Sequence, residues 1–487
     1  MAHEAVIGLE CHIQLRSRTK MFCECRAAFG AKPNSNVCPV CLGLPGALPR
    51  ANRVAVEAAL RLGLALGCTV RQESDFARKN YFYPDMPKNY QITQYERPLC
   101  EGGALPVEVH GTERTFEISR IHLEEDTGKS FHPERRGERP VSRVDFNRAG
   151  VPLLELVTRP TFREPGECGA FLTTLRRLVR WLGVSEGDME KGHLRCDANV
   201  SLRPAGTAGL GVKTELKNLN SIKGVEKGLR AEIARQRGIL ESGGSVEQAT
   251  LLFDAEQDRL VIMRSKEDVQ DYRYFPEPDL PPLRVDEEWL RRAREGLPEL
   301  PWVRVARFQA EHGLRAEDAR VLCEQRDVAD YFDEVARAAA APRRAAGWIM
   351  TEVLRRVREL GAKVEDARDR LPAGRLAFLI AEVEAKRVTA ATAKSVLEES
   401  MRTGADPREI LAARGAAATG SPEELAPLVR QVLEEHPAEV ARYLGGRSGT
   451  LGFLVGQVVK RSGGRALPQV VRRLLLAELE ARGGPGA

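Results

Sequence analysis

Charged side chains recur inside short, strand-like apolar runs in the first half of this 487-residue chain. Burying one unpaired charge costs on the order of several kcal/mol, so a domain built from such runs must hold the charges against a metal ion, a phosphate group or one another. The pattern therefore predicts an active site rather than a purely structural core. The runs are residues 8–12, 121–129, 145–148, 195–201 and 213–218.

The length exceeds what one hydrophobic core supports, so the chain should divide into several domains. It is 43% hydrophobic, has no apolar run of membrane-spanning length, and begins without a signal-peptide pattern. We therefore expect a soluble, cytoplasmic protein with no membrane partner. The net charge of +5 is small for this length and does not by itself indicate nucleic-acid binding.

The fold class expected from the spacing of apolar residues is α+β. Residues 1–290 mix β-branched runs with Gly- and Pro-rich turns, which indicates a largely antiparallel sheet. Two stretches of this domain, 53–66 and 167–182, have helical spacing. A proline-rich segment at 272–283 should leave the domain as an extended strand.

Two further domains, both helical, are expected after residue 290. An all-α helical domain should occupy 291–388, and a small α-helical tail domain 389–487. The expected helices are 320–337, 345–360, 373–384, 392–401, 425–436, one capped by Asp406 that begins at Pro407, and a final one from Pro468.

Four cysteines form two short pairs, Cys23 with Cys25 and Cys38 with Cys41, separated by twelve residues. Each pair can place two thiolates on one tetrahedral ion, and thiolates without carboxylates favour Zn²⁺. We interpret 23–41 as a structural zinc knuckle. The alternatives are four reduced, partly buried cysteines, or a redox pair, for which no thioredoxin-like frame is present.

The most concentrated charge lies in three consecutive acids, Glu124, Glu125 and Asp126, which repel one another unless cations neutralise them. Glu10 and His12 point to one face of a predicted strand. Together these oxygens and one imidazole suit Mg²⁺ bound to nucleotide phosphates. Taken alone, Glu10 and His12 favour an ordinary surface strand, and only the acidic triplet reverses that interpretation.

A second polar group alternates along a predicted hairpin. Asp197, Asn199 and Ser201 share one strand face, and Glu215 and Lys217 share a face of the next strand. The hairpin could offer acceptors to a metal ion and donors to phosphate oxygens. The alternative is the solvent face of an amphipathic hairpin.

Two more cations have alternative interpretations. Lys88 lies in an aromatic, proline-containing loop and is a candidate phosphate contact. Arg148 could hold a carboxylate or phosphate, or form a structural ion pair. The chain has no phosphate-binding Gly-rich loop, no kinase signature and no Ser-rich amidase signature. ATP would therefore bind at a less common site, and ammonia would not be made here.

Long segments of the chain resemble the B subunits of the aspartyl/glutamyl-tRNA amidotransferases, the GatB family. The matching segments, in order along nearly the whole chain, are 6–15, 36–46, 121–129, 145–155, 215–221, 271–282 and 451–458. The resemblance implies a cradle-like α+β domain, a helical domain and a helical tail, in a heterotrimer with A and C subunits. The A subunit hydrolyses glutamine. The B subunit uses ATP and Mg²⁺ to activate the side-chain carboxylate of Glu-tRNA(Gln) or Asp-tRNA(Asn), and ammonia then forms the amide.

The resemblance also implies roles for the candidate residues. Glu10, His12 and Glu125 become the first Mg²⁺ ligands, with Glu124 and Glu215 close behind, and Glu125 is the base for ammonium. Glu124, Glu125 and Lys217 are the catalytic candidates. The expected ATP-binding residues are Lys88, Asp197, Asn199, Ser201 and Glu215. Lys460, Arg461, Arg472 and Arg473 would contact tRNA phosphates, although without the resemblance they indicate only a solvated helix face.

One departure from the family pattern lies at 250–258, where relatives commonly carry Glu-Thr-Arg and Trp-Asp, while Met263-Arg264-Ser-Lys266-Glu is retained. Two other functions stay open: a zinc-bearing RNA-binding scaffold, which has no use for converging acids, and a stand-alone ammonia-dependent ligase. The sequence does not decide between the two mischarged tRNAs.

Overall fold

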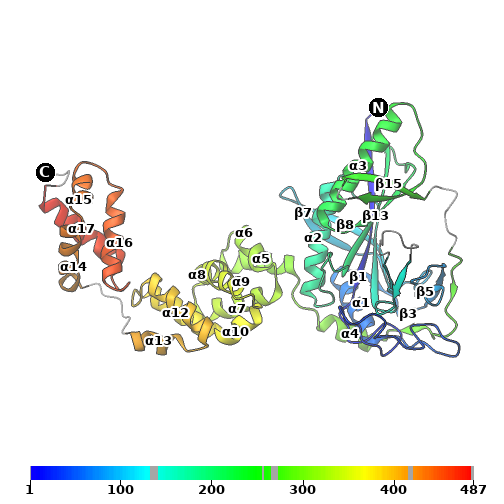
Figure 1. Cartoon of the computed structure of the whole chain (residues 1–487), viewed down its shortest axis with the longest axis horizontal. Helices are drawn as coiled ribbons and strands as arrows, with labels where there is room; N and C mark the ends of the chain where they lie inside the picture. The colour runs from blue at the N-terminus through cyan, green and yellow to red at the C-terminus, as the bar shows by residue number, and fades with distance from the viewer. Residues whose placement is uncertain (1, 132–140, 255–256, 265–271, 415–420, 484–487) are drawn as a thin grey trace. The chain divides into compact units, whose positions relative to one another are not determined.

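The computed structural model describes residues 2–131, 141–254, 257–264, 272–414 and 421–483. The chain forms two compact units, Met1–Trp302 and Val303–Ala487. In the described residues the first unit combines a large sheet with helices and the second is helical (Figure 1). The predicted α+β fold class is confirmed. The division of the chain into three domains stays a prediction.

A ten-stranded sheet forms the centre of the first unit. Its pairs are antiparallel except for two strands joined by a helix, which run parallel because the connection crosses over the sheet. The order across the sheet is β15 (Arg259–Arg264), β14 (Thr250–Asp254), β13 (Thr214–Leu219), β12 (Leu194–Pro204), β1 (His3–Gln14), β11 (Pro152–Thr158), β8 (Thr112–Glu125), β6 (Cys100–Glu101) and β2 (Thr69–Val70), with β7 (Ala104–Val109) also paired to β8. The parallel pair is β13 and β14.

The two faces of this sheet differ in chemistry, as strand β1 illustrates. Leu9, Cys11 and Ile13 are at most 1% exposed and lie in the hydrophobic core, whereas Glu10 and His12 alternate with them and point to the opposite face. Four helices bury apolar residues in that same core: α1 (Arg53–Ala65), α2 (Pro165–Trp181), α3 (Ile222–Glu241) and α4 (Glu287–Glu295). The helices predicted at 53–66 and 167–182 are thus confirmed as α1 and α2, and the other sheet face is left for polar side chains.

Short strands complete the first unit. Three small sheets pair β16 (Phe275–Pro276) with β4 (Ala77–Asn80) and β4 with β5 (Tyr90–Thr93), β10 (Arg143–Asp145) with β9 (Lys129–Phe131), and β17 (Leu283–Arg284) with β3 (Glu73–Ser74). The proline-rich segment supplies β16 and β17, so its described part is extended, as predicted. Helix α4 (Glu287–Glu295) follows it.

The second unit is a succession of helices. They are α5 (Pro301–His312), which begins at the unit boundary, then α6 (Ala316–Leu322), α7 (Arg326–Ala339), α8 (Pro342–Trp348), the π-helical turn η2 (Ile349–Val353), α9 (Leu354–Glu359), α10 (Val364–Arg370), α11 (Ala373–Glu384), α12 (Ala390–Thr403), α13 (Pro407–Arg414), α14 (Pro422–Glu435), α15 (Pro437–Leu444), α16 (Thr450–Arg461) and α17 (Pro468–Ala481). Helix α11 and the starts at Pro407 and Pro468 are as predicted.

One predicted helix was wrong. The run 320–337 is broken, because α6 ends at Leu322 and α7 begins at Arg326. Leu322 and Phe332 are both fully buried, so the packing of two separate helices overrides a periodicity that lacks a Gly or Pro stop signal. The run 345–360 also differs, since η2 interrupts it. Among the described residues, no helix is both long and apolar enough to cross a membrane.

Candidate active site

The polar face of the large sheet carries a row of ionisable side chains. The strand register places Glu10 opposite Asp197, His12 opposite Glu155, and Glu155 opposite His122. Residues paired directly across antiparallel strands share one face, so these side chains converge although they come from four strands. They line a cavity of about 260 Å³, here called the acidic cavity. Its other lining residues include Lys79, Tyr95, Arg120, Glu124, Glu215, Lys217, Tyr272 and Tyr274.

Three residues of the acidic cavity form a candidate metal site. The Nε2 atom of His12 lies 3.5 Å from Oε2 of Glu155 and 3.7 Å from Oε1 of Glu124. One ligand atom from each of the three residues lies within 4.8 Å of the others. Glu124 and Glu155 are buried, at 1% and 8% exposed. Two hard carboxylates and one imidazole fit a divalent cation that also binds phosphate oxygens, such as Mg²⁺.

The electrostatics of this group favour added positive charge. Burial raises the pKa of Glu124, and the charge of Glu155 raises it further. Burial disfavours the charged form of His12, but the hydrogen bond and charge of Glu155, together with the charge of Glu124, raise the pKa of His12 to about 9. Burial also opposes ionisation of Glu155, yet His122 and His12 hold its pKa well below the usual value. A divalent cation bound here would take the place of the His12 proton at Nε2 and relieve the repulsion between the two carboxylates.

A lysine held by two acids lies on the hairpin side of the acidic cavity. The Nζ atom of Lys217 is 2.9 Å from Oδ2 of Asp197 and 2.9 Å from Oε1 of Glu215. Burial lowers the pKa of Lys217, but the charges of Asp197 and Glu215 outweigh it, so the net shift is upward and the ammonium stays charged. Asn199 donates a hydrogen bond of 2.8 Å from Nδ2 to Oε1 of Glu10. The hairpin thus orders both a cation and an acid at this edge of the cavity.

The three consecutive acids point in three directions. Glu124 faces His12 in the acidic cavity, and Glu125 forms an ion pair with Lys88 on the other side of strand β8. Oδ1 of Asp126 accepts a hydrogen bond of 2.9 Å from Arg195, and its Oδ2 lies 3.5 Å from Nε of Arg148. Each acid therefore has its own protein cation. For Arg148, the structural ion pair is the alternative that the contacts favour.

Glu125 and Lys88 line a second cavity of about 200 Å³, here called the knuckle cavity. Oε1 of Glu125 also accepts a hydrogen bond of 3.0 Å from the backbone N–H of Ile92. Cys23 and Cys41 line the same cavity. Because successive side chains of a strand point to opposite faces, Glu124 and Glu125 serve different cavities although they are adjacent in sequence.

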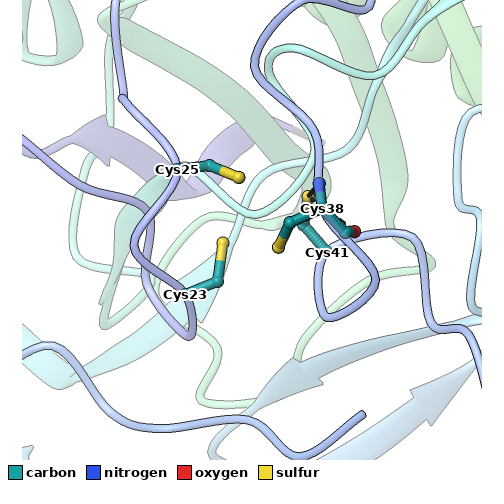
Figure 2. A group of neighbouring side chains, drawn as sticks. All are labelled: Cys23, Cys25, Cys38 and Cys41. Carbon is teal, nitrogen blue, oxygen red and sulfur yellow. Dashed lines mark hydrogen bonds between the residues drawn. The ribbon is translucent and has the colours of Figure 1, made fainter.

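The four clustered cysteines converge from two loops, as Figure 2 shows. Their sulfur atoms all lie within 4.8 Å of one another. The backbone N–H of Cys38 donates to Sγ of Cys41 at 3.2 Å. The hydrogen bond from the Cys23 thiol lowers the pKa of Cys41 to about 4, and the charge of Lys20 contributes to this effect. The same hydrogen bond raises the pKa of Cys23, and burial raises the pKa of Cys25 to about 11. Four convergent sulfurs fit a tetrahedral Zn²⁺, which would bind all four as thiolates.

The structure brings most of the predicted site residues together, but not all of them. Glu10, His12, Glu124, Asp197, Glu215 and Lys217 line the acidic cavity, and Asn199 contacts Glu10. Glu125 and Lys88 belong to the knuckle cavity instead. Ser201 is buried opposite Val6 and does not line the acidic cavity.

Sequence reasoning missed Glu155, His122 and Lys79. The signal for Glu155 was an acid inside the apolar run Leu153-Leu154-Glu155-Leu156, and His122 preceded the acidic triplet by two residues. Their importance follows only from the strand register. Residues 255–256 of the departure at 250–258, residues 265–267 of the retained 263–267 motif, and Asp271 lie outside the described residues.

Comparisons with known proteins match the chain along its length. Residues 5–291 match the family described as "GatB/GatE catalytic domain", and residues 330–479 the family described as "GatB domain". The chain is similar to the aspartyl/glutamyl-tRNA(Asn/Gln) amidotransferase B subunit of Moorella thermoacetica, with 47% identity over 98% of this chain and 100% of the relative. The proteins of that name from Carboxydothermus hydrogenoformans, at 45% over 98% and 99%, and Thermodesulfovibrio yellowstonii, at 44% over 99% and 100%, are similar as well.

Proposed function

Because this chain belongs to the family of aspartyl/glutamyl-tRNA(Asn/Gln) amidotransferase B subunits, we propose that it performs the ATP-dependent amidation step of that enzyme. It activates the side-chain carboxylate of Glu-tRNA(Gln) or Asp-tRNA(Asn) by phosphorylation. Ammonia from a glutaminase A subunit then replaces the phosphate, giving Gln-tRNA(Gln) or Asn-tRNA(Asn) for translation. The protein is thus a ligase, and its role in translation fits a cytoplasmic location.

The observation that carries this proposal is the acidic cavity, in which His12, Glu124 and Glu155 share one face of the sheet. These three residues would hold Mg²⁺, with Glu10 beside them. When bound, the ion supplies positive charge for phosphate oxygens. The proposed ligand set therefore contains Glu155 in place of Glu125. An RNA-binding scaffold would have no use for two buried carboxylates, Glu124 and Glu155, on the same face as the half-buried Glu10.

The cations of the acidic cavity position the anionic substrates. A carboxylate becomes an acyl donor only after one of its oxygens has become part of a phosphate leaving group, and transfer of a phosphoryl group depends mainly on alignment and charge neutralisation. Lys217, held by Asp197 and Glu215, donates to phosphate oxygens. Lys79 lines the same cavity and adds positive charge for the same phosphate oxygens. Ser201 is buried away from the cavity, so its contribution is to the packing of β12.

Glu125 and Lys88 handle ammonia rather than the nucleotide. Only neutral ammonia is nucleophilic, so an incoming ammonium must lose a proton. The Glu125 carboxylate accepts that proton in the knuckle cavity, and the Lys88 ammonium orients the carboxylate. The activated carboxylate of the substrate lies on the other side of strand β8, beside Glu124. This arrangement separates the proton acceptor from the phosphorylated group by one strand.

The proposed function also includes a zinc site, two partner subunits and contacts with tRNA. Cys23, Cys25, Cys38 and Cys41 would hold a structural Zn²⁺, and four protein ligands would leave no position for water. The protein works in a heterotrimer with A and C subunits. Lys460, Arg461, Arg472 and Arg473 are exposed on α16 and α17 and bind tRNA phosphates.

The test is transamidation by the co-purified complex, given glutamine, ATP, Mg²⁺ and each mischarged tRNA in turn. We expect Glu124→Gln to abolish amide formation on tRNA while glutamine hydrolysis continues, because only the activation site is damaged. The control is Glu117→Gln on the same strand, where the side chain is 59% exposed. Full transamidation by the Glu124→Gln complex would favour a scaffold role, and amidation by the isolated chain with ammonium salt alone would favour a stand-alone ligase.

A further inference from the structure

Lys20 is a fully buried lysine next to the four cysteines. Its side chain is 0% exposed, and Nζ lies 3.5 Å from Sγ of Cys41 and 3.2 Å from the carbonyl oxygen of Phe146. Its backbone N–H donates to the carbonyl of Cys25 at 2.9 Å. Lys20 therefore contacts both cysteine pairs, one through its backbone and the other through its ammonium group.

The surroundings of Lys20 suit a negatively charged metal complex. A buried ammonium is costly unless an anion compensates it. Its polar side-chain partners in the described part of the chain are a sulfur atom and a carbonyl oxygen. A divalent ion with four thiolates carries a net charge of −2, and an N–H donor to one sulfur stabilises that charge. The buried cation thus fits the complex better than it fits four neutral thiols.

The same residue lies against the knuckle cavity through Gly150. A Cβ atom added to Gly150 would lie 3.4 Å from Cδ of Lys20, 3.5 Å from Cβ of Cys41 and 3.7 Å from Oε2 of Glu125. Met21, the next residue, donates from its N–H to the carbonyl of Gly150 at 2.7 Å. The metal-binding loop and the Glu125 carboxylate therefore approach each other around one glycine.

A second approach joins the loop to Lys88. Gly43 follows Cys41 by two residues, and a Cβ atom added there would overlap Cγ of Lys88 and lie 3.1 Å from its Cβ. The loop backbone at Gly43 thus sets how far the Lys88 side chain can move. Both members of the Glu125–Lys88 pair are packed against the cysteine loop or the turn that holds it.

We propose that Lys20 is a positioning residue that stabilises the tetrathiolate metal centre and, through it, fixes the Glu125–Lys88 pair of the knuckle cavity. The metal knuckle is then more than a local support. It sets the geometry of the ammonia-handling pair, an interpretation that rests on the proposed function for the role of that pair but not for the metal centre.

Metal affinity tests the first half of the proposal. Zn²⁺ or Co²⁺ is titrated into the purified complex against a competing chelator, for native protein, Lys20→Met and Lys20→Arg. We expect Lys20→Met to weaken metal binding roughly 10–100-fold and to shift the cobalt–thiolate absorption band, because the donor to Cys41 is lost. Lys20→Arg, which keeps the charge, should recover part of the affinity. Circular dichroism verifies that each variant is folded.

The second half is tested without changing a metal ligand or Lys20. Gly43 and Gly30 both have positive φ, +67° and +77°, but a Cβ at Gly30 meets nothing within 4 Å. We expect Gly43→Ala to raise the KM for ammonium in ammonium-driven transamidation roughly 10–100-fold, since a displacement near 1 Å at a reacting group can cost that much. Gly30→Ala carries the same backbone strain and should leave this KM unchanged.

Each outcome decides one question. Unchanged metal affinity and an unshifted cobalt band in Lys20→Met would overturn the role of Lys20 at the metal. Equal KM values for the Gly43→Ala and Gly30→Ala complexes would overturn the link to Lys88. If the native complex transamidates neither tRNA, the proposed function fails instead, and the metal titration still tests Lys20.

Discussion

Adjacent side chains of a strand point to opposite faces of the sheet, so two neighbouring acids of a strand contact different sites. Glu124 and Glu125 are neighbours on β8, yet one faces His12 and the other faces Lys88. The two-residue period of a strand sends them to opposite sides of the sheet. Proximity along the chain therefore wrongly groups Glu125 with the metal ligands. It also hides Glu155, which lies thirty residues further on.

The replacement of Glu155 is the sharpest test of this separation. We expect Glu155→Gln to raise the Mg²⁺ concentration needed for half-maximal transamidation at least about 10-fold, because one anionic ligand atom becomes a neutral amide. The measurement is a Mg²⁺ titration of amide formation by the complex.

The exposed acid Glu117 on the same strand provides the comparison. Glu117→Gln should match the native titration curve. A Glu155→Gln curve that also matches the native one would remove Glu155 from the ligand set.

At the scale of elements, partly buried ion pairs join helices α5 and α7 of the second unit. Arg304 and Arg307 on α5 both contact Oδ2 of Asp333 on α7, at 2.9 and 2.7 Å. The Asp333 side chain is 14% exposed. Burial raises the pKa of Asp333, but the hydrogen bond and charge of Arg307 and the charge of Arg304 lower it more. The ionised form of Asp333 is therefore the one that stabilises the contact of α5 with α7.

The lowered pKa of Asp333 makes the stability of the helical unit depend on pH. A carboxyl with a lowered pKa in the folded state stabilises the fold fully above its unfolded pKa of about 3.9, and this stabilisation is lost as pH falls through the folded value. We expect Asp333→Asn to destabilise the helical unit by about 1–3 kcal/mol at pH 7 and by progressively less below pH 4. Thermal unfolding of the native and variant proteins across pH measures this difference.

An exposed pair supplies the control for this experiment. Arg344 and Glu384 are 67% and 45% exposed, and exposed pairs contribute little. Glu384→Gln should therefore change stability at neutral pH by less than about 0.5 kcal/mol. A difference between Asp333→Asn and the native protein that persists unchanged at acidic pH would indicate lost packing rather than lost charge.

For the whole molecule, the two compact units predict two unfolding events. The large core of the first unit contains residues from Ala5 to Ala293, and a separate core in the second contains residues from Leu425 to Leu479. The cysteine knuckle lies entirely in the first unit. Since structural metal contributes directly to folding free energy, its removal should affect one unit alone.

Calorimetry tests this expectation. We expect a strong chelator to lower the melting temperature of the transition assigned to the first unit by roughly 5 °C or more, with the helical transition unchanged. Residues 303–487, expressed separately, identify the helical transition. An equal shift of both transitions, or of neither, would contradict a metal site confined to the first unit.

Local sequence determined much of this protein. Apolar spacing gave α1, α2 and α11, and Asp406 and Pro407 marked the start of α13, because caps and periodicity act within a few residues. The cysteine spacing was equally readable, since two short pairs chelate locally. The resemblance of the motifs to one family is confirmed by the comparisons.

Only the tertiary structure decided which charges meet. Glu155 and His122 join His12 because three strands, distant in sequence, pair in one register, and no local pattern contains that register. The buried ammonium of Lys20 and its approach to Glu125 around Gly150 depend on loops whose course is set by long-range hydrogen bonds. Local chemistry specified the ionisable groups and the elements that carry them, whereas strand pairing and loop packing selected the partners of each group.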